Sequence, residues 1–125
     1  MRQLKARLIA VGFAICAMLA GPALAQTAVP GQPIVPLGYC QIAAVTLATS
    51  TPLSSCSGGI PTGATIAVLQ SETAPIRYRD DGVAPTSSSG MLLVNGAGVF
   101  YPGTLSKLRF IAASGSPVLN VAFYR

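Results

Sequence analysis

Charged side chains that could carry chemistry are concentrated in one short run of this sequence. Beyond the first seven positions the chain holds eight acidic or basic residues, and four of them lie within residues 75–82. A second basic pair follows nearer the C-terminus. Together the charged candidates are Arg77, Arg79, Asp80, Asp81, Lys107 and Arg109. These groups could form ion pairs within a solvated face or across a contact between subunits. Exposed ion pairs are common, so the solvated face is the simpler interpretation.

Catalytic chemistry has few candidates. The chain contains no histidine, which removes Ser-His and Cys-His pairs and imidazole metal ligands. Asp80 and Asp81 are adjacent, so on a strand they would point to opposite faces and would not converge on a substrate. The same run lacks the alternating acidic ligands and the closing glutamate of a calcium loop. We therefore predict that the protein is not an enzyme, takes no cofactor and holds no metal.

Residues 1–25 have the pattern of a secretory signal peptide. Three basic residues precede an apolar run over residues 8–19, and Ala23 and Ala25 supply small side chains before a cut at Gln26. A retained membrane anchor is the alternative, although Gly21-Pro22 would break its helix and the run barely reaches spanning length. We predict export to the periplasm, cell envelope or extracellular space, with no stable membrane span after cleavage.

Removal of this leader changes the charge balance. Three of the eight basic residues leave with it, so five basic residues face three acidic ones and the net charge falls to +2. A phosphate-binding face needs clustered Lys and Arg, and the chain offers only the pairs Arg77/Arg79 and Lys107/Arg109. The sequence therefore does not predict nucleic-acid binding.

Cys40 and Cys56 are the two cysteines that remain after cleavage, 16 positions apart. An isolated pair in an exported protein most often forms one disulfide. Closing a loop of that size stabilises the fold by about 3 kcal/mol in the chain-entropy model. A redox site is the alternative, but the sequence has no C-x-x-C motif and no evident base to lower a thiol pKa.

The elements that position these side chains are predicted to be short strands. Residues 26–37 contain three prolines and should form an extended arm, and residues 50–63 read as a loop. Asn95-Gly96 is the strongest hairpin signal in the chain. The predicted strands cover residues 38–49, with a bulge, and residues 64–71, 75–79, 91–94, 98–101, 105–112 and 118–124. About seven strands predict an all-β class, a single antiparallel β-sandwich or jelly-roll-like domain over residues 38–125.

Alternation within the strands assigns side chains to faces. Ile76 and Tyr78 should face the core and Arg77 and Arg79 the opposite side, before an Asp-Gly turn in which Gly82 takes a positive φ. In the last strand, Leu119, Val121 and Phe123 should point inward. Residues 66–69 are all apolar, which predicts burial on both faces of that strand.

Several motifs carry a resemblance when read in order. Residues 76–86 read IRYRDDGVAPT, a Gly-Met pair follows at residues 90–91, and residues 101–103, 105–111 and 119–124 read YPG, LSKLRFI and LNVAFY. Over residues 39–124 this order resembles small structural proteins of phage virions and prophages, the decoration-like β-domain proteins. The resemblance implies a β-sandwich subunit that forms homo-oligomers or binds a protein partner, without catalytic residues. The export signal departs from that pattern, because virion subunits normally assemble in the cytoplasm.

Three functions follow as hypotheses. The first is a non-enzymatic structural or assembly protein, exported and resembling phage virion subunits, with a virion-associated location as the alternative to the envelope. The second is a secreted or envelope-associated binding module for a protein or carbohydrate, although the lack of Trp leaves few aromatic side chains for a sugar platform. The third, a small hydrolase, is disfavoured by the missing histidine and the scattered acids.

Overall fold

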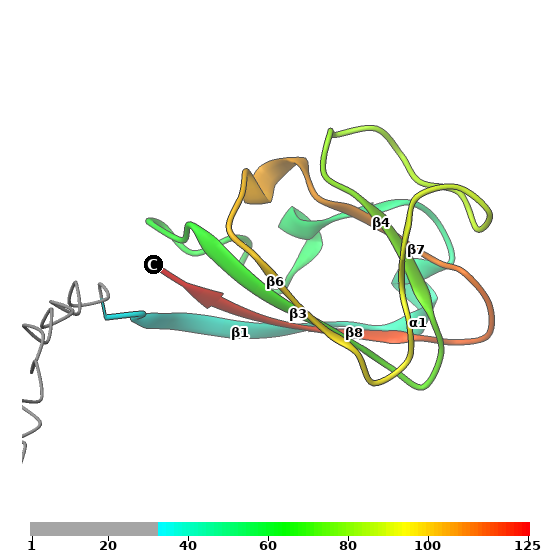
Figure 1. The fold of residues 1–125 in the computed structure, drawn as a ribbon, viewed down its shortest axis with the longest axis horizontal. Coiled ribbons are helices and arrows are strands. Elements are labelled where there is room, and N and C mark those ends of the chain that lie inside the picture. Colours follow the sequence, from blue (N-terminus) through cyan, green and yellow to red (C-terminus); the bar gives the residue numbers. More distant parts are fainter. Residues whose placement is uncertain (1–32) are drawn as a thin grey trace, which may run out of the picture. The chain divides into compact units, whose positions relative to one another are not determined.

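Two four-stranded antiparallel sheets make up residues 33–125, the part of the chain that the computed structural model describes. The predicted signal peptide and residues 26–32 of the predicted arm lie outside the described residues. One sheet has the order β1-β8-β3-β6 and the other β2-β7-β4-β5 (Figure 1). The strands are β1 (Pro36–Ile42), β2 (Thr51–Pro52), β3 (Ile66–Glu72), β4 (Ile76–Arg79), β5 (Met91–Leu93), β6 (Gly98–Tyr101), β7 (Arg109–Ala112) and β8 (Val118–Tyr124).

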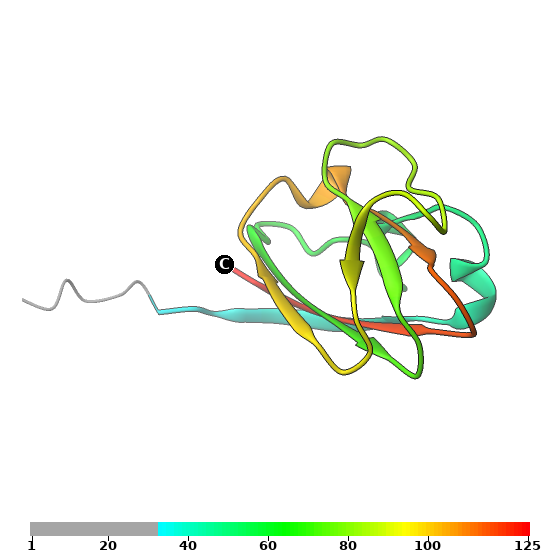
Figure 2. The ribbon, with the colours of Figure 1, turned by 45° about the vertical axis from the view of Figure 1, so that its right-hand side comes forward.

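The strand pairing is nested. The first strand pairs with the last, the second with the seventh, the third with the sixth and the fourth with the fifth. Further pairs, β3 with β8 and β4 with β7, complete the two sheets. Consecutive strands change sheet at every step except from β4 to β5 (Figure 2). This is the arrangement of a jelly roll, an antiparallel ribbon wrapped into two sheets, and it confirms the predicted all-β class.

The core lies between the two sheets and is supplied by alternate residues of their strands. Leu119, Val121 and Phe123 of β8 are 0%, 0% and 1% exposed, which confirms their predicted inward orientation. Ile76 and Tyr78 of β4 are also buried and face the same core from the other sheet. The prediction that β3 is buried on both faces was wrong. Its residues Ala67 and Leu69 are buried, whereas Ile66 and Val68 are only partly covered, because β3 has the core on one side alone.

The first predicted strand, residues 38–49, is wrong at both ends. β1 begins at Pro36, inside the predicted arm, and ends at Ile42. A short helix α1 (Ala44–Leu47) follows, in which the Thr46 and Leu47 amides donate to the Ala43 carbonyl at 3.0 and 3.2 Å. This helical turn carries Leu47 into the core, where it is fully buried. The change of pattern that suggested a bulge marks that turn.

The predicted hairpin at Asn95-Gly96 is also wrong. The turn itself forms, with Gly96 at φ +79° and the Ala97 amide donating to the Val94 carbonyl at 3.1 Å. However, it leads from β5 in one sheet to β6 in the other, and these strands pair with β4 and β3. The Gly96 amide donates to the Ser71 carbonyl of β3 at 2.8 Å. The dipeptide therefore encodes a reversal of the chain but not the pairing of the strands that flank it.

Two further segments differ from the expected pattern. The predicted loop over residues 50–63 contains the two-residue strand β2 and a 3₁₀ turn, η1 (Leu53–Ser55). The predicted strand over residues 105–112 begins instead with a second 3₁₀ turn, η2 (Leu105–Lys107), before β7 starts at Arg109. Both turns bury one leucine, Leu53 and Leu105, so their apolar side chains serve the core without a strand.

Candidate interaction surface

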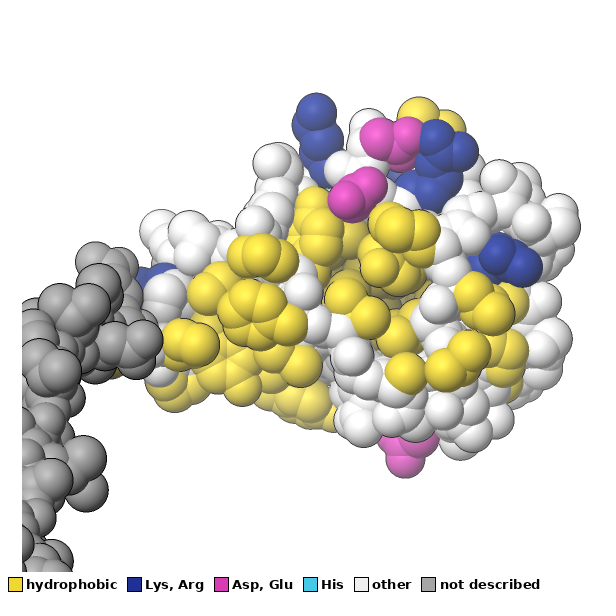
Figure 3. Space-filling view, viewed as in Figure 1, with side chains coloured by type: hydrophobic (Ala, Val, Ile, Leu, Met, Phe, Trp, Pro, Cys, Tyr) yellow, Lys and Arg dark blue, Asp and Glu magenta, His cyan; other side chains and the backbone are white. Residues whose placement is uncertain are grey.

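The charged candidates lie on and beside the outer face of the β2-β7-β4-β5 sheet. β4 and β7 are neighbours in this sheet, and their register places Arg79 opposite Arg109 and Arg77 opposite Ile111. Because Ile76 and Tyr78 point into the core, the alternate residues Arg77 and Arg79 point outward. Their strand positions are as the sequence predicts. We call Arg77, Arg79, Asp80, Asp81, Lys107 and Arg109 together the charged face; Figure 3 shows basic and acidic side chains gathered near the top of the view.

Arg79 and Asp81 form the one ion pair found among residues 33–125. The Arg79 Nη2 and Nε groups both donate to the Asp81 carboxylate, the latter at 3.1 Å, and the Val83 amide donates to Asp81 Oδ1 at 3.0 Å. These hydrogen bonds, first that of Arg79 and then that of Val83, lower the pKa of Asp81 to about 2. Arg79 is therefore neutralised within its own chain.

Gly82 provides the turn that accompanies the ion pair between Arg79 and Asp81. Its φ of +85° turns the chain sharply after the two aspartates, as the sequence predicts. Its amide then donates to the Lys107 carbonyl at 3.1 Å, which fixes the turn beside η2. The turn brings residues 79–82 next to Lys107, although the two segments are far apart in the sequence.

Arg77 is occupied in holding a loop. Its Nε donates to the Ser87 carbonyl at 2.9 Å and its Nη1 to the Gly90 carbonyl at 2.8 Å. Both acceptors lie in the segment between β4 and β5. We therefore assign Arg77 a structural role. Its guanidinium is a charged donor that satisfies two backbone carbonyls of an exposed loop. The sequence pattern could not distinguish it from Arg79.

The remaining members of the charged face are less fully paired. Arg109 donates only long hydrogen bonds, at 3.3 and 3.4 Å, to the hydroxyl and carbonyl oxygens of Ser50. Lys107 and Asp80 are exposed and take part in no ion pair within residues 33–125. Burial raises the pKa of Tyr78 and Tyr101, and the negative charge of Asp80 raises both further.

In the described part of the chain, no three His, Cys, Asp or Glu side chains come together in a group that could hold a metal ion. Among the same residues, no helix is long and apolar enough to cross a membrane. What the charged face can do chemically is to bind opposite charges, through Asp80, Lys107 and Arg109, which take part in no ion pair within residues 33–125.

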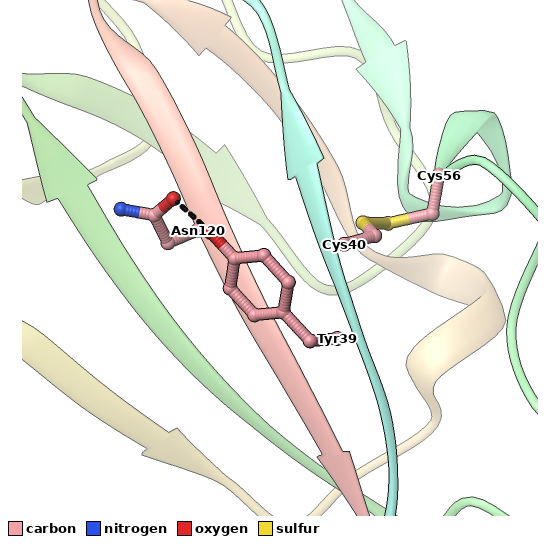
Figure 4. Close-up of a disulfide and its surroundings, with 4 residues drawn as sticks. All are labelled: Tyr39, Cys40, Cys56 and Asn120. Atoms are coloured by element: carbon pink, nitrogen blue, oxygen red, sulfur yellow. Dashed lines mark hydrogen bonds between the residues drawn. A yellow bond between two sulfur atoms is a disulfide. The ribbon is translucent and has the colours of Figure 1, made fainter.

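The predicted disulfide between Cys40 and Cys56 is present and buried. The two Cα atoms are 5.7 Å apart, and the cysteines are 5% and 4% exposed. The bond ties β1 to the residue that follows η1 (Figure 4). Disulfides persist in oxidising compartments, so this bond is typical of a protein outside the reducing cytoplasm.

A second group of polar side chains escaped the sequence reasoning. Tyr39, the neighbour of Cys40 on β1, donates its hydroxyl to Asn120 Oδ1 at 2.7 Å (Figure 4). Gln41 Nε2 donates to the same oxygen at 3.0 Å, and Asn120 Nδ2 donates to Glu72 Oε2 at 3.0 Å. These residues come from β1, β8 and β3. Alternation could have placed each on an outer face, but only the strand order shows that they meet.

Comparison with known proteins adds no assignment, because no protein-family model, curated protein or solved structure matches this chain.

Proposed function

We propose that the protein is a non-enzymatic structural or assembly subunit that is exported and associates with copies of itself. The observation that carries this proposal is the incomplete pairing of the charged face. Arg79 is neutralised by Asp81, whereas Asp80, Lys107 and Arg109 are left without an ion-pair partner in residues 33–125. One surface thus holds both a carboxylate and cations that a second molecule can satisfy.

Such a surface suits a two-fold contact. In an isologous interface the same patch of two copies meets, so Asp80 of one copy can face Lys107 or Arg109 of the other, twice over. Exposed apolar side chains lie in the same region: Val83 is 52% exposed beside Asp81, and Leu92 is 49% exposed opposite Arg77. Arginine combined with apolar contact area is typical of protein interfaces.

The fold and the disulfide support the rest of the proposal. Jelly rolls serve as subunits of viral capsids, in line with the resemblance of residues 39–124 to phage structural proteins. A jelly roll also serves unrelated functions, so the fold alone does not decide the role. The Cys40–Cys56 bond favours export to the envelope or beyond, as the signal-like residues 1–25 also do.

The test is sedimentation velocity of the purified protein with charge reversals on this face. The wild type should form dimers that weaken as salt rises, because exposed charges are screened. Arg109→Glu and Asp80→Arg should each weaken self-association by about tenfold or more. A one-to-one mixture of these two variants should associate again, because each reversed charge then meets its opposite.

Arg125→Glu is the matched control. It makes the same change of charge at an exposed position next to the other sheet, so it should leave self-association unchanged. A wild type that stays monomeric at every concentration, or a mixture of Arg109→Glu and Asp80→Arg that fails to associate, would contradict the proposal.

A further inference from the structure

The outer face of the β1-β8-β3-β6 sheet carries a row of amide side chains. Strand register places Gln41 opposite Asn120, and Asn120 opposite Gln70. The row ends at Gly98 of β6, which leaves the position beyond Gln70 free of a side chain. Asn120 is held by Tyr39, Gln41 and Glu72, so the middle of the row has a fixed orientation.

An apolar row lies next to the amide row on the same face. Tyr39 is opposite Ala122, Ala122 opposite Val68, and Val68 opposite Phe100. Tyr39 and Phe100 belong to the two edge strands and are 63% and 54% exposed. The Tyr39 ring leans over β8, where its hydroxyl donates to Asn120 (Figure 4). In the row between Tyr39 and Phe100 lie the smaller side chains of Ala122 and Val68. Figure 3 shows hydrophobic side chains gathered over this part of the sheet, towards the C-terminus.

The charge on this face is low. Glu72 is the one residue of strands β1, β8, β3 and β6 whose side chain is charged at neutral pH, and it already accepts a hydrogen bond from Asn120. The described basic residues lie with the other sheet, except Arg125, which follows β8. The face therefore offers little attraction to nucleic acid, anionic lipid or another polyanion.

An amide row that lies beside an apolar row matches the chemistry of a neutral sugar chain. A pyranose ring presents C–H groups that pack on aromatic and aliphatic side chains, and hydroxyl groups that both donate and accept hydrogen bonds. Each amide likewise has donors and an acceptor. Gln70 makes none of the side-chain hydrogen bonds found in residues 33–125, and Gln41 uses one donor alone. The row thus keeps unused groups that face solvent.

We propose that this face binds an extended, uncharged polysaccharide that crosses the four strands. Neighbouring strands are about 4.8 Å apart, close to the length of one sugar ring in an extended chain, so about one ring should lie over each strand. The aromatic rings of Tyr39 and Phe100 would hold the two ends, and the amides would bind the hydroxyls between them. This binding function adds to the assembly role and does not depend on it.

A second copy of the chain is the competing occupant of this face. An interface that buried the face would also bury Gln70 and the free groups of Gln41, and each buried polar group without a partner is costly. The charged face of the other sheet offers self-association a surface with complementary charges. These two points favour the sugar chain over a second copy.

The test is isothermal titration of the purified protein with cello- and chito-oligosaccharides of two to six rings. For at least one series, affinity should rise up to about four rings and then level off, since longer chains pass beyond the sheet. Phe100→Ala and Gln70→Ala should each weaken binding by about tenfold or more. Met91→Ala, which removes a 45% exposed apolar side chain from the other sheet, is the matched control and should bind like the wild type.

Three results would overturn the proposal. One is the absence of binding in both series, and another is binding that Phe100→Ala and Gln70→Ala leave unchanged. The third is a wild-type dimer that Phe100→Ala converts to monomer, which would assign this face to a second copy. Phe100 and Gln70 are exposed, so both variants should keep the wild-type melting temperature and report on binding alone.

Discussion

At the scale of single residues, Gly82 shows how one backbone conformation organises the charged face. Its φ is +85°, and a Cβ built there would meet nothing closer than Lys107 Cγ at 4.0 Å. Gly82→Ala should therefore cost about 1–2 kcal/mol in the free energy of unfolding through backbone strain, without a steric clash. Chemical denaturation measures this cost.

Gly98→Ala is the control for this prediction. A Cβ at Gly98 is equally unobstructed, with Leu69 O at 3.9 Å, but its φ lies outside the left-handed region. This substitution should be neutral or slightly stabilising, because alanine restricts the unfolded chain. If the two variants unfolded alike, strain at Gly82 would not be the reason for its glycine.

The sequence allowed the roles of some charged residues to be predicted and not of others. Alternation along residues 76–79 was enough to place Arg77 and Arg79 on an outer face. Their different partners, loop carbonyls for Arg77 and Asp81 for Arg79, depend on how the segment between β4 and β5 folds back. The contact between Gly82 and Lys107 depends on the pairing of β4 with β7, which no local pattern encodes.

At the scale of elements, two phenylalanines allow a buried position to be compared with an exposed one. Phe110 of β7 is fully buried, and its ring centroid lies 6.4 Å from that of Tyr78. Phe110→Ala should cost about 3–5 kcal/mol in the free energy of unfolding, because it leaves a cavity between the sheets. Phe100→Ala removes the same atoms from an exposed position on β6 and should change stability by about 0.5 kcal/mol or less. Urea denaturation of both variants is the measurement, and equal losses would contradict the assigned faces.

Elements with strong alternation were predictable, and short ones were not. The strand over residues 118–124 was predicted with its ends and its inward face, because seven alternating residues leave one interpretation. β2 has two residues and α1 has four, too few for any periodic signal. Asn95-Gly96 failed differently: its turn was correct, but the flanking strands bind partners elsewhere in the chain.

At the scale of the whole domain, the disulfide supports a fold whose two sheets bury a small core. Cys40→Ala combined with Cys56→Ala should lower the free energy of unfolding by about 3 kcal/mol, since the open chain gains freedom when it unfolds. Thermal denaturation with and without a reducing agent checks this. The reductant should lower the melting temperature of the wild type to that of the double variant, which should itself be insensitive. A wild type whose melting temperature is unchanged by full reduction of the disulfide would contradict the prediction.

The all-β class of the domain could be predicted from the sequence, but the order in which its strands pair could not. Recurrent short strands separated by turn residues indicate two packed sheets. Which strands pair is decided by contacts between residues as far apart as Pro36 and Tyr124, and a single sequence carries no direct record of such contacts. The amide row is invisible for the same reason, since it exists only once β1, β8 and β3 are side by side.

The nested pairing has a consequence for the order in which the chain folds. β4 and β5 are separated by one loop and can meet first, whereas β1 must wait for β8, the last strand to be synthesised. Pairings so distant in sequence slow folding towards the range of about milliseconds to seconds. Until then both edges of β1 are unpaired, the state in which a strand recruits foreign strands most readily. Cys56 is synthesised long before β8, so its link to Cys40 can hold β1 against the segment that follows η1 during that delay.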